Sequence, residues 1–212
     1  MAVMVIAPLS QSRADDDYSI ASAQGFGTCC SWFSNTQAGW FFPQDLNFTP
    51  RGFAGNHIAD FKSGWGTQLD LLAAVNPALA VGLTIGYFQA QMNALTTAAG
   101  VIAPASGDLV MAPLMLTAIY HRQVFNRLSF FAGVSWGLMH YRFDISAPTV
   151  ALNRYTQSQW NFAAGLRAGI AIRLMQNLSF IATYEFMKGF SSEGYSGHAI
   201  LLGFSTPWCW DE

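Results

Sequence analysis

Four residues near the C-terminal end of the chain have the types that a serine hydrolase uses: a hydroxyl nucleophile, an acid and a base. They are Ser191, Ser192, Glu193 and His198. Nucleophilic catalysis needs the hydroxyl and the imidazole within hydrogen-bond distance, and this spacing is not diagnostic of such a pair. The sequence therefore predicts no catalytic residue and a protein that is not an enzyme, with a lipid-modifying enzyme as the alternative.

The histidines do not indicate a metal site. His57, His121, His140 and His198 are scattered along the chain. None of them shows ligand spacing such as H-x-x-x-H, which would place two imidazoles on one metal ion. We therefore expect neither a metal ion nor a cofactor.

Four charged residues stand out as candidates for the inside of a barrel, and they are Asp70, Arg167, Arg173 and Glu185. Two of them fall in Trp160–Leu174, whose even positions are all apolar and whose odd positions are small, polar or charged. A period of two indicates a β-strand, because successive side chains leave opposite faces of the backbone. The segment Trp160–Leu174 is longer than the usual soluble strand of about 5–6 residues. Its length suits a tilted strand that crosses a bilayer, which needs about 9–11 residues.

Composition supports a membrane barrel. Hydrophobic residues make up 52% of the 212 residues and charged residues only 10%, whereas a typical soluble domain has about 25% charged residues. The mean hydropathy of +0.26 is nevertheless low for a bundle of membrane helices. An apolar outside and a polar inside explain both values. A soluble lipocalin-like carrier would need its charges outside, and too few are present to coat it.

Nucleic-acid binding is not expected. The formal net charge is −2, whereas a nucleic-acid-binding surface is usually basic. Several tryptophans, among them Trp32, Trp40, Trp65 and Trp160, fall near strand ends on the predicted outer face. This position is typical of the aromatic girdle of a membrane barrel rather than of a stacking platform.

Eight segments have the period of a strand, and they are 31–42, 64–75, 79–92, 108–124, a strand that begins at Leu128, 160–174, 178–190 and 197–208. The uncharged stretch between Asp70 and Asp108 would otherwise suit membrane helices, but Pro77, recurrent glycines and alternation over 79–92 favour strands. Short connections at 76–78, 125–127 and 175–177 alternate with long ones such as 43–63, 93–107 and 146–156. The sequence therefore predicts an all-β fold, a closed eight-stranded antiparallel up-and-down transmembrane β-barrel.

The faces of the strands also predict their register. Residues directly opposite in an antiparallel pair point the same way, so lipid-facing residues must pair with lipid-facing residues. Pairing Leu174 with Leu178 across a three-residue turn satisfies this condition, as do Val75 with Leu79 and Val124 with Leu128. The same register places Arg167 opposite Glu185, with both side chains inside the barrel.

The predicted interior charges allow two functions. Asp70, Arg167, Arg173 and Glu185 would form either a gate or narrow path for small solutes, or a polar network that plugs the barrel. The interior of an eight-stranded barrel is just wide enough for side chains to fill it. Buried charges are costly unless they are paired and hydrogen-bonded, so we expect the plug.

The strands resemble those of a known family. The segments APLMLTAIYHR, LSFFAGVSWGL, WNFAAGLRAGIAIRL, NLSFIATYEF and HAILLGFS are similar to successive strands of OmpA-like, and especially opacity-protein-like, outer-membrane barrels. The resemblance covers roughly residues 31–208. It implies a bacterial outer-membrane location, periplasmic termini and surface-exposed loops. The chain departs from the family at its end, TPWCWDE, which lacks the usual terminal aromatic residue.

The remaining parts of the chain flank the barrel. Residues 1–14 resemble the later part of a secretory signal, 15–30 a periplasmic lead-in and 209–212 a C-terminal tail. Cys209 follows the last strand, while Cys29 and Cys30 precede the first, and these strands are neighbours in a closed barrel. We expect Cys209 to pair with Cys29 or Cys30, since the periplasm permits disulfides; three unpaired thiols are the alternative.

These features predict a small, monomeric outer-membrane barrel that contacts membrane lipid and acts as a structural anchor or surface-interaction protein. Loops 43–63 and 93–107 are the expected contact surface for an extracellular or host ligand.

Overall fold

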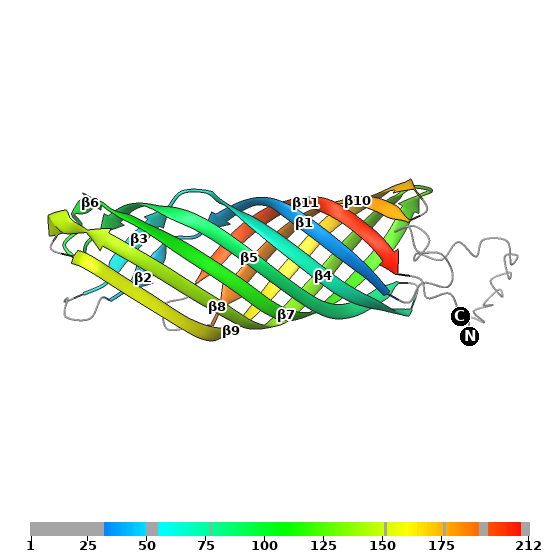
Figure 1. Ribbon diagram of the computed structural model, residues 1–212, viewed down its shortest axis with the longest axis horizontal. Coiled ribbons are helices and arrows are strands. Elements are labelled where there is room, and N and C mark those ends of the chain that lie inside the picture. The colour runs from blue at the N-terminus through cyan, green and yellow to red at the C-terminus, as the bar shows by residue number, and fades with distance from the viewer. Residues whose placement is uncertain are drawn as a thin grey trace, which may run out of the picture.

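The computed structural model describes residues 32–49, 55–76, 78–150, 152–175, 177–190 and 195–208, which form one elongated barrel (Figure 1). Eight long strands build its wall: β1 (Trp32–Pro43), β4 (Gly64–Asn76), β5 (Leu79–Thr96), β7 (Ser106–Phe125), β8 (Leu128–Ala147), β9 (Leu152–Met175), β10 (Leu178–Gly189) and β11 (Ser196–Trp208). The connections contain three short strands, β2 (Leu46–Phe48), β3 (His57–Phe61) and β6 (Ile102–Pro104), and a short 3-10 helix, Pro148–Val150.

The eight long strands form a ring. Each pairs antiparallel with the next one along the chain, and β1 pairs with β11. This last pairing runs from Trp32 opposite Trp208 to Pro43 opposite Gly197. We call the end with Trp32 and Trp208 the terminal end and the opposite one the distal end. The ring confirms the predicted up-and-down barrel.

The register within the strands confirms the prediction, but the turns differ from it. Glu185 lies opposite Arg167. At the turn, however, Leu178 pairs with Met175 and not with Leu174, because a bulge shifts the register by one residue at the last step. The same shift pairs Asn76 with Leu79 and Phe125 with Leu128.

Two of the predicted loops are partly sheet. β2 pairs with β3, while β3 and β6 both pair with the distal part of β5. The third predicted loop, 146–156, is shorter than expected because β8 extends to Ala147 and β9 begins at Leu152. The long strands and these short ones together form a distal extension, visible as the end of Figure 1 that carries β2, β3 and β6.

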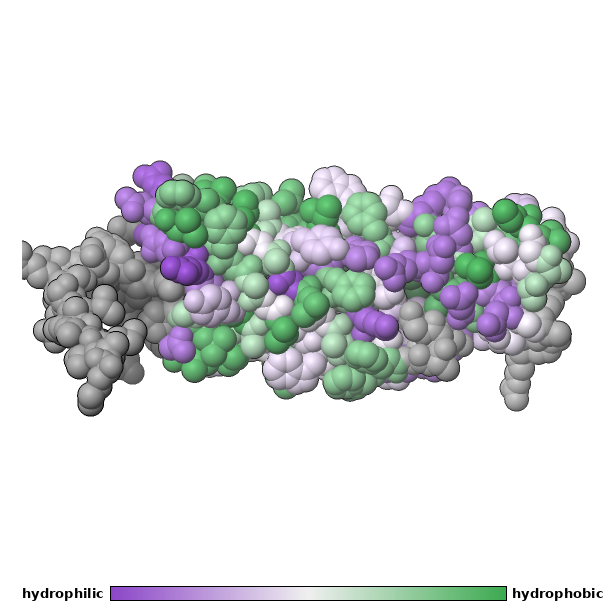
Figure 2. Space-filling model, turned by 180° about the vertical axis from the view of Figure 1, so that it is seen from behind, coloured by the Kyte–Doolittle hydropathy of each residue, from purple (hydrophilic) through white to green (hydrophobic). Residues whose placement is uncertain are grey.

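The outward side chains change character along the barrel. Near the terminal end they are apolar, as on β8, where Phe130, Val134, Trp136 and Leu138 are 43–49% exposed. Further along the same face of β8 come His140, Arg142 and Asp144. Figure 2 shows this on one side of the molecule, with a band of apolar side chains and hydrophilic ones gathered beyond it toward the distal end. Among the described residues, no helix is long and apolar enough to cross a bilayer.

The interior is filled in three layers. Near the terminal end it is a small apolar cluster of Phe33, Leu72, Ala80, Ile119 and Phe131. The middle layer is polar, as β5 shows: Ala80 is followed on the inward face by Thr84 and then by Phe88. The distal layer is a large apolar core that includes Phe41, Phe48, Phe88, Met111, Met139, Tyr141 and Phe143. The polar side chains expected in the interior thus form one layer between two apolar ones.

Candidate functional site

Arg167 is the centre of the polar layer, and the strand register explains its position. It lies on β9 between Gly133 of β8 and Glu185 of β10. A Cβ atom at Gly133 would be 3.2 Å from Cγ of Arg167, so glycine leaves the space through which the long side chain runs. The Arg167 side chain is only 1% exposed.

The guanidinium joins strands on opposite sides of the ring. Its Nη1 donates to both carboxylate oxygens of Asp70 on β4, each at 3.0 Å. Its Nη2 donates to Oε1 of Glu185 on β10 at 3.1 Å and to Oγ1 of Thr84 on β5 at 3.3 Å. Since β4 lies four places from β9 in the eight-stranded ring, these contacts hold the wall together across its interior.

Asp70 is the main acceptor of the layer. It accepts six hydrogen bonds, two of them from Arg167. The other four come from Asn35 Nδ2 at 3.2 Å, Gln37 Nε2 at 3.3 Å, Gln68 Nε2 at 3.3 Å and Thr84 Oγ1 at 2.7 Å. The alternation predicts an inward position for these side chains. It does not reveal their convergence on one carboxylate, because that depends on the closure of the ring.

Glu185 is held more loosely than Asp70. Its Oε1 accepts a hydrogen bond from Arg167, whereas its buried Oε2 has no hydrogen-bond partner among the described residues. Two carboxylates therefore share one guanidinium in a layer without exposure to water. Such a cluster cross-links the barrel but contains no nucleophile that a substrate could reach.

The structure brings three of the four predicted interior charges together. Asp70, Arg167 and Glu185 are in direct contact, whereas Arg173 lies opposite Ser179, six residues nearer the terminal end of the strand, and is partly exposed. Six residues correspond to about 20 Å of strand. The predicted disulfide residues Cys29, Cys30 and Cys209 lie outside the described residues.

The candidate hydrolase residues are not brought together in the described part of the chain. Ser191, Ser192 and Glu193 lie outside it. His198 is on the outer face of β11, where Tyr184 Oη is 2.5 Å from its Nδ1 and Gln44 Nε2 is 3.2 Å from its Nε2. Both ring nitrogens of His198 are thus already within hydrogen-bond distance of other side chains.

The other histidines are dispersed. His57 and His121 are buried, and His140 Nε2 lies 2.9 Å from Ser158 Oγ on the outer face. In the part of the chain that the structure describes, no three histidine, cysteine, aspartate or glutamate residues gather in a way that could hold a metal ion.

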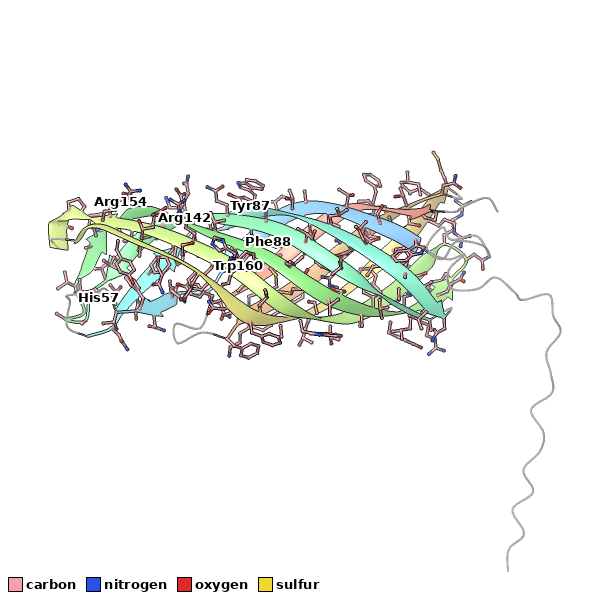
Figure 3. The ribbon with its side chains drawn as sticks, turned by 60° about the horizontal axis from the view of Figure 1, so that its bottom comes forward. His57, Tyr87, Phe88, Arg142, Arg154 and Trp160 are labelled. Atoms are coloured by element: carbon pink, nitrogen blue, oxygen red, sulfur yellow. The ribbon has the colours of Figure 1, made fainter. Side chains whose placement is uncertain are left out.

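An ion pair lies on the outer face of the distal extension. Arg142 Nη2 and Asp144 Oδ2 are 2.9 Å apart, and Arg142 and Arg154 both lie on the distal part of the barrel, beyond Trp160 (Figure 3). Thr156 Oγ1 donates to Asp144 Oδ1 at 2.5 Å. This hydrogen bond, together with the Arg142 guanidinium, holds the pKa of Asp144 below its usual value.

An eight-stranded ring with an apolar outer band and a filled interior defines a transmembrane β-barrel of the outer-membrane type. Solved structures agree with this class. The chain is similar to the outer membrane protein OprG from Pseudomonas aeruginosa, with 15% identity, a TM-score of 0.57, and 87% of this chain and 99% of that chain covered.

Two further structures are similar at the same level. A major outer membrane protein from Thermus thermophilus has 17% identity, a TM-score of 0.54, and 84% and 99% of the two chains covered. Neisserial surface protein A has 13% identity, a TM-score of 0.52, and 84% and 97% covered. At these identities the likeness concerns the fold, and it confirms the resemblance to small outer-membrane barrels and supports the predicted location. No family model and no curated protein sequence matches the chain.

Proposed function

We propose that this chain is a non-enzymatic protein of the bacterial outer membrane, a closed and plugged barrel that displays its distal extension at the cell surface. One observation carries this function: the interior is filled along its length, with the Asp70–Arg167–Glu185 cluster between two apolar layers. A scaffold of this kind favours display over transport. Periplasmic termini, a monomeric state and a ligand for the distal extension belong to the same proposal.

Electrical recording tests the plug. The purified protein in a planar bilayer should give no stable conductance, because no side chain of the central cluster is exposed to water. A steady open pore in the wild-type protein would favour the narrow channel instead.

Replacement of the distal connection tests the surface function. Residues 97–101 join β5 to β6 at the tip of the distal extension. Exchanging them for an epitope tag should make the tag accessible to antibody on intact cells and leave the heat-dependent gel shift of the barrel unchanged. A tag that is accessible only after the outer membrane is opened would contradict the orientation.

The lipid-modifying enzyme has less support. His198 is the only one of its four candidate residues within the described part, and both of its ring nitrogens have partners there. Turnover of outer-membrane lipid by the purified protein, lost on His198→Ala, would overturn the non-enzymatic proposal.

A further inference from the structure

A compact group of polar side chains lies on the outer face of the barrel, at the distal ends of three adjacent strands. Tyr184 and Lys188 belong to β10, Ser196 and His198 to β11, and Gln44 directly follows β1. Lys188 lies opposite Ser196, and the backbone nitrogen of Gln44 donates to the carbonyl oxygen of Ser196 at 2.9 Å. We call these five residues the rim cluster.

Four members of the rim cluster form a hydrogen-bonded chain. Ser196 Oγ donates to Gln44 Oε1 at 2.5 Å, and Gln44 Nε2 donates to His198 Nε2 at 3.2 Å. A neutral imidazole that accepts at Nε2 carries its hydrogen on Nδ1, which therefore donates to Tyr184 Oη at 2.5 Å. Two hydrogens then make no hydrogen bond within this group of four side chains: the phenolic hydrogen of Tyr184 and the second hydrogen of Gln44 Nε2.

Lys188 gives the rim cluster a positive charge. Its side chain is exposed, and it takes part in none of the ion pairs between described residues. Asp45, the described acidic residue next to Gln44 in sequence, forms no ion pair with it. The rim cluster thus offers an ammonium group and two further donors, the combination that binds a phosphate group.

The rim cluster lies at the edge of the apolar band. Beyond His198 the outward residues of β11 are Ile200, Leu202 and Phe204, which are 40–48% exposed. The Phe186 ring packs against His198 with centroids 5.0 Å apart. In a membrane barrel, this transition from polar and aromatic residues to aliphatic ones is the level where lipid head groups meet acyl chains.

An apolar groove lies on the same outer face, within the membrane half of the barrel. It has a volume of 560 Å³ and crosses β11, β1, β4 and β5, where the small side chains of Thr36, Ala38 and Thr67 lie between Phe204 and Tyr87. On β11 it begins four residues from His198, about 14 Å along the strand. A lipid held at the rim cluster has this groove within the reach of its chains.

We propose that the rim cluster binds the phosphate of a phosphorylated lipid head group in the membrane leaflet at the distal end, with Lys188, Tyr184 and Gln44 as donors. Such binding requires the outer-membrane location proposed above, but neither a closed interior nor a ligand for the distal extension. A conducting barrel would therefore overturn the plug and leave lipid binding intact.

The test compares two lipids that differ only in phosphate. The purified full chain in detergent is titrated with bis-phosphorylated lipid A and with its dephosphorylated form, and bound lipid is counted by native mass spectrometry. The wild-type protein should bind the phosphorylated form about tenfold more tightly, the factor that one charge-assisted hydrogen bond supplies. Equal binding of the two forms overturns the proposal.

Variants separate the rim cluster from general charge attraction. Lys188→Gln and Tyr184→Phe should each remove most of the preference for phosphate. Arg154→Gln is the matched control, because it also removes one exposed cation from the distal half and should leave the preference unchanged. An equal loss in Arg154→Gln, or no loss in the first two variants, contradicts the proposal. Loss of the heat-dependent gel shift identifies a variant that fails to fold. If Lys188→Gln or Tyr184→Phe fails to fold, the lipid preference of the other one decides the test.

Discussion

The membrane half of this barrel and its distal extension follow opposite rules on the same strands. On β8, the inward residue Ser135 lies at the level of the polar layer while Phe130 and Trp136 face outward. Beyond Leu138, the inward residues Met139, Tyr141, Phe143 and Ile145 are 0–1% exposed. The strand does not change its register with β7 there, since Met139 pairs with Pro113 and Tyr141 with Met111 in one continuous ladder.

The difference between the halves follows from what surrounds them. In the membrane half the outside is hydrocarbon, so apolar side chains face outward and polar ones find partners inside. In the distal half the outside is water, so apolar side chains are buried inside as in a soluble protein. The sheet is continuous, and the surrounding medium decides whether its outward positions are apolar or polar.

Removing the central guanidinium should have the largest effect on the membrane half. Arg167→Met leaves the carboxylates of Asp70 and Glu185 without their cation, which should lower the free energy of unfolding by about 3–5 kcal/mol. Urea unfolding in lipid vesicles measures the loss. Arg142→Met is the matched control in the distal half, where the exposed pair with Asp144 should contribute less than about 1 kcal/mol. Similar losses in both variants would contradict the contrast between the halves.

The distal core should respond as a soluble core does. Phe143 is fully buried and packs against Phe48 with ring centroids 5.3 Å apart. Phe143→Ala should cost about 3–5 kcal/mol and expose the distal extension to protease, while the membrane half keeps its heat-dependent gel shift. Phe130→Ala, on the lipid-facing side, is the control and should leave protease resistance unchanged. A protease-resistant Phe143→Ala would show that the distal core does not hold the extension.

The two buried carboxylates should differ in their sensitivity to neutral replacement. Asp70→Asn weakens a hub of six hydrogen bonds and should cost about 2–3 kcal/mol, because hydrogen bonds to charged groups are the strongest. Glu185→Gln affects a carboxylate with one hydrogen bond and an unpartnered oxygen, and should cost less than about 1 kcal/mol. Urea unfolding measures both losses of free energy, from the midpoints of variants whose unfolding slope equals that of the wild-type protein. A larger loss in Glu185→Gln than in Asp70→Asn would contradict the role of Asp70 as the main acceptor.

The smallest effect is a pH dependence in the distal half. The folded-state pKa of Asp144 is lowered from 3.8 by the Thr156 hydrogen bond and by Arg142. A lowered carboxyl pKa stabilises the folded state above the unfolded value, and this contribution is lost as the pH falls through the folded value. Protease resistance of the distal extension should thus decline at acidic pH and do so less in Asp144→Asn. An identical pH profile in both proteins would remove Asp144 as a cause.

Much of the fold was predictable because lipid outside the barrel imposes a strict pattern. The alternation of Trp160–Leu174 predicted one strand of the wall, its outer face and its register with β10, and the structure has Arg167 opposite Glu185. Residues 93–96 of β5, 146–147 of β8 and 152–156 of β9 were predicted as loop. On β8 the alternation continues with the opposite phase from Met139 to Ser146, and this inversion is the sequence signal that the strand extends beyond the membrane half.

What the sequence determined by itself was local: which residues alternate, which face meets lipid, and which neighbouring strands pair. These follow from a period of two and from short turns, both of which act over a few residues. Only the tertiary structure decided that Asp70 and Arg167 meet across the ring. This contact depends on ring closure, which no single segment of the chain encodes.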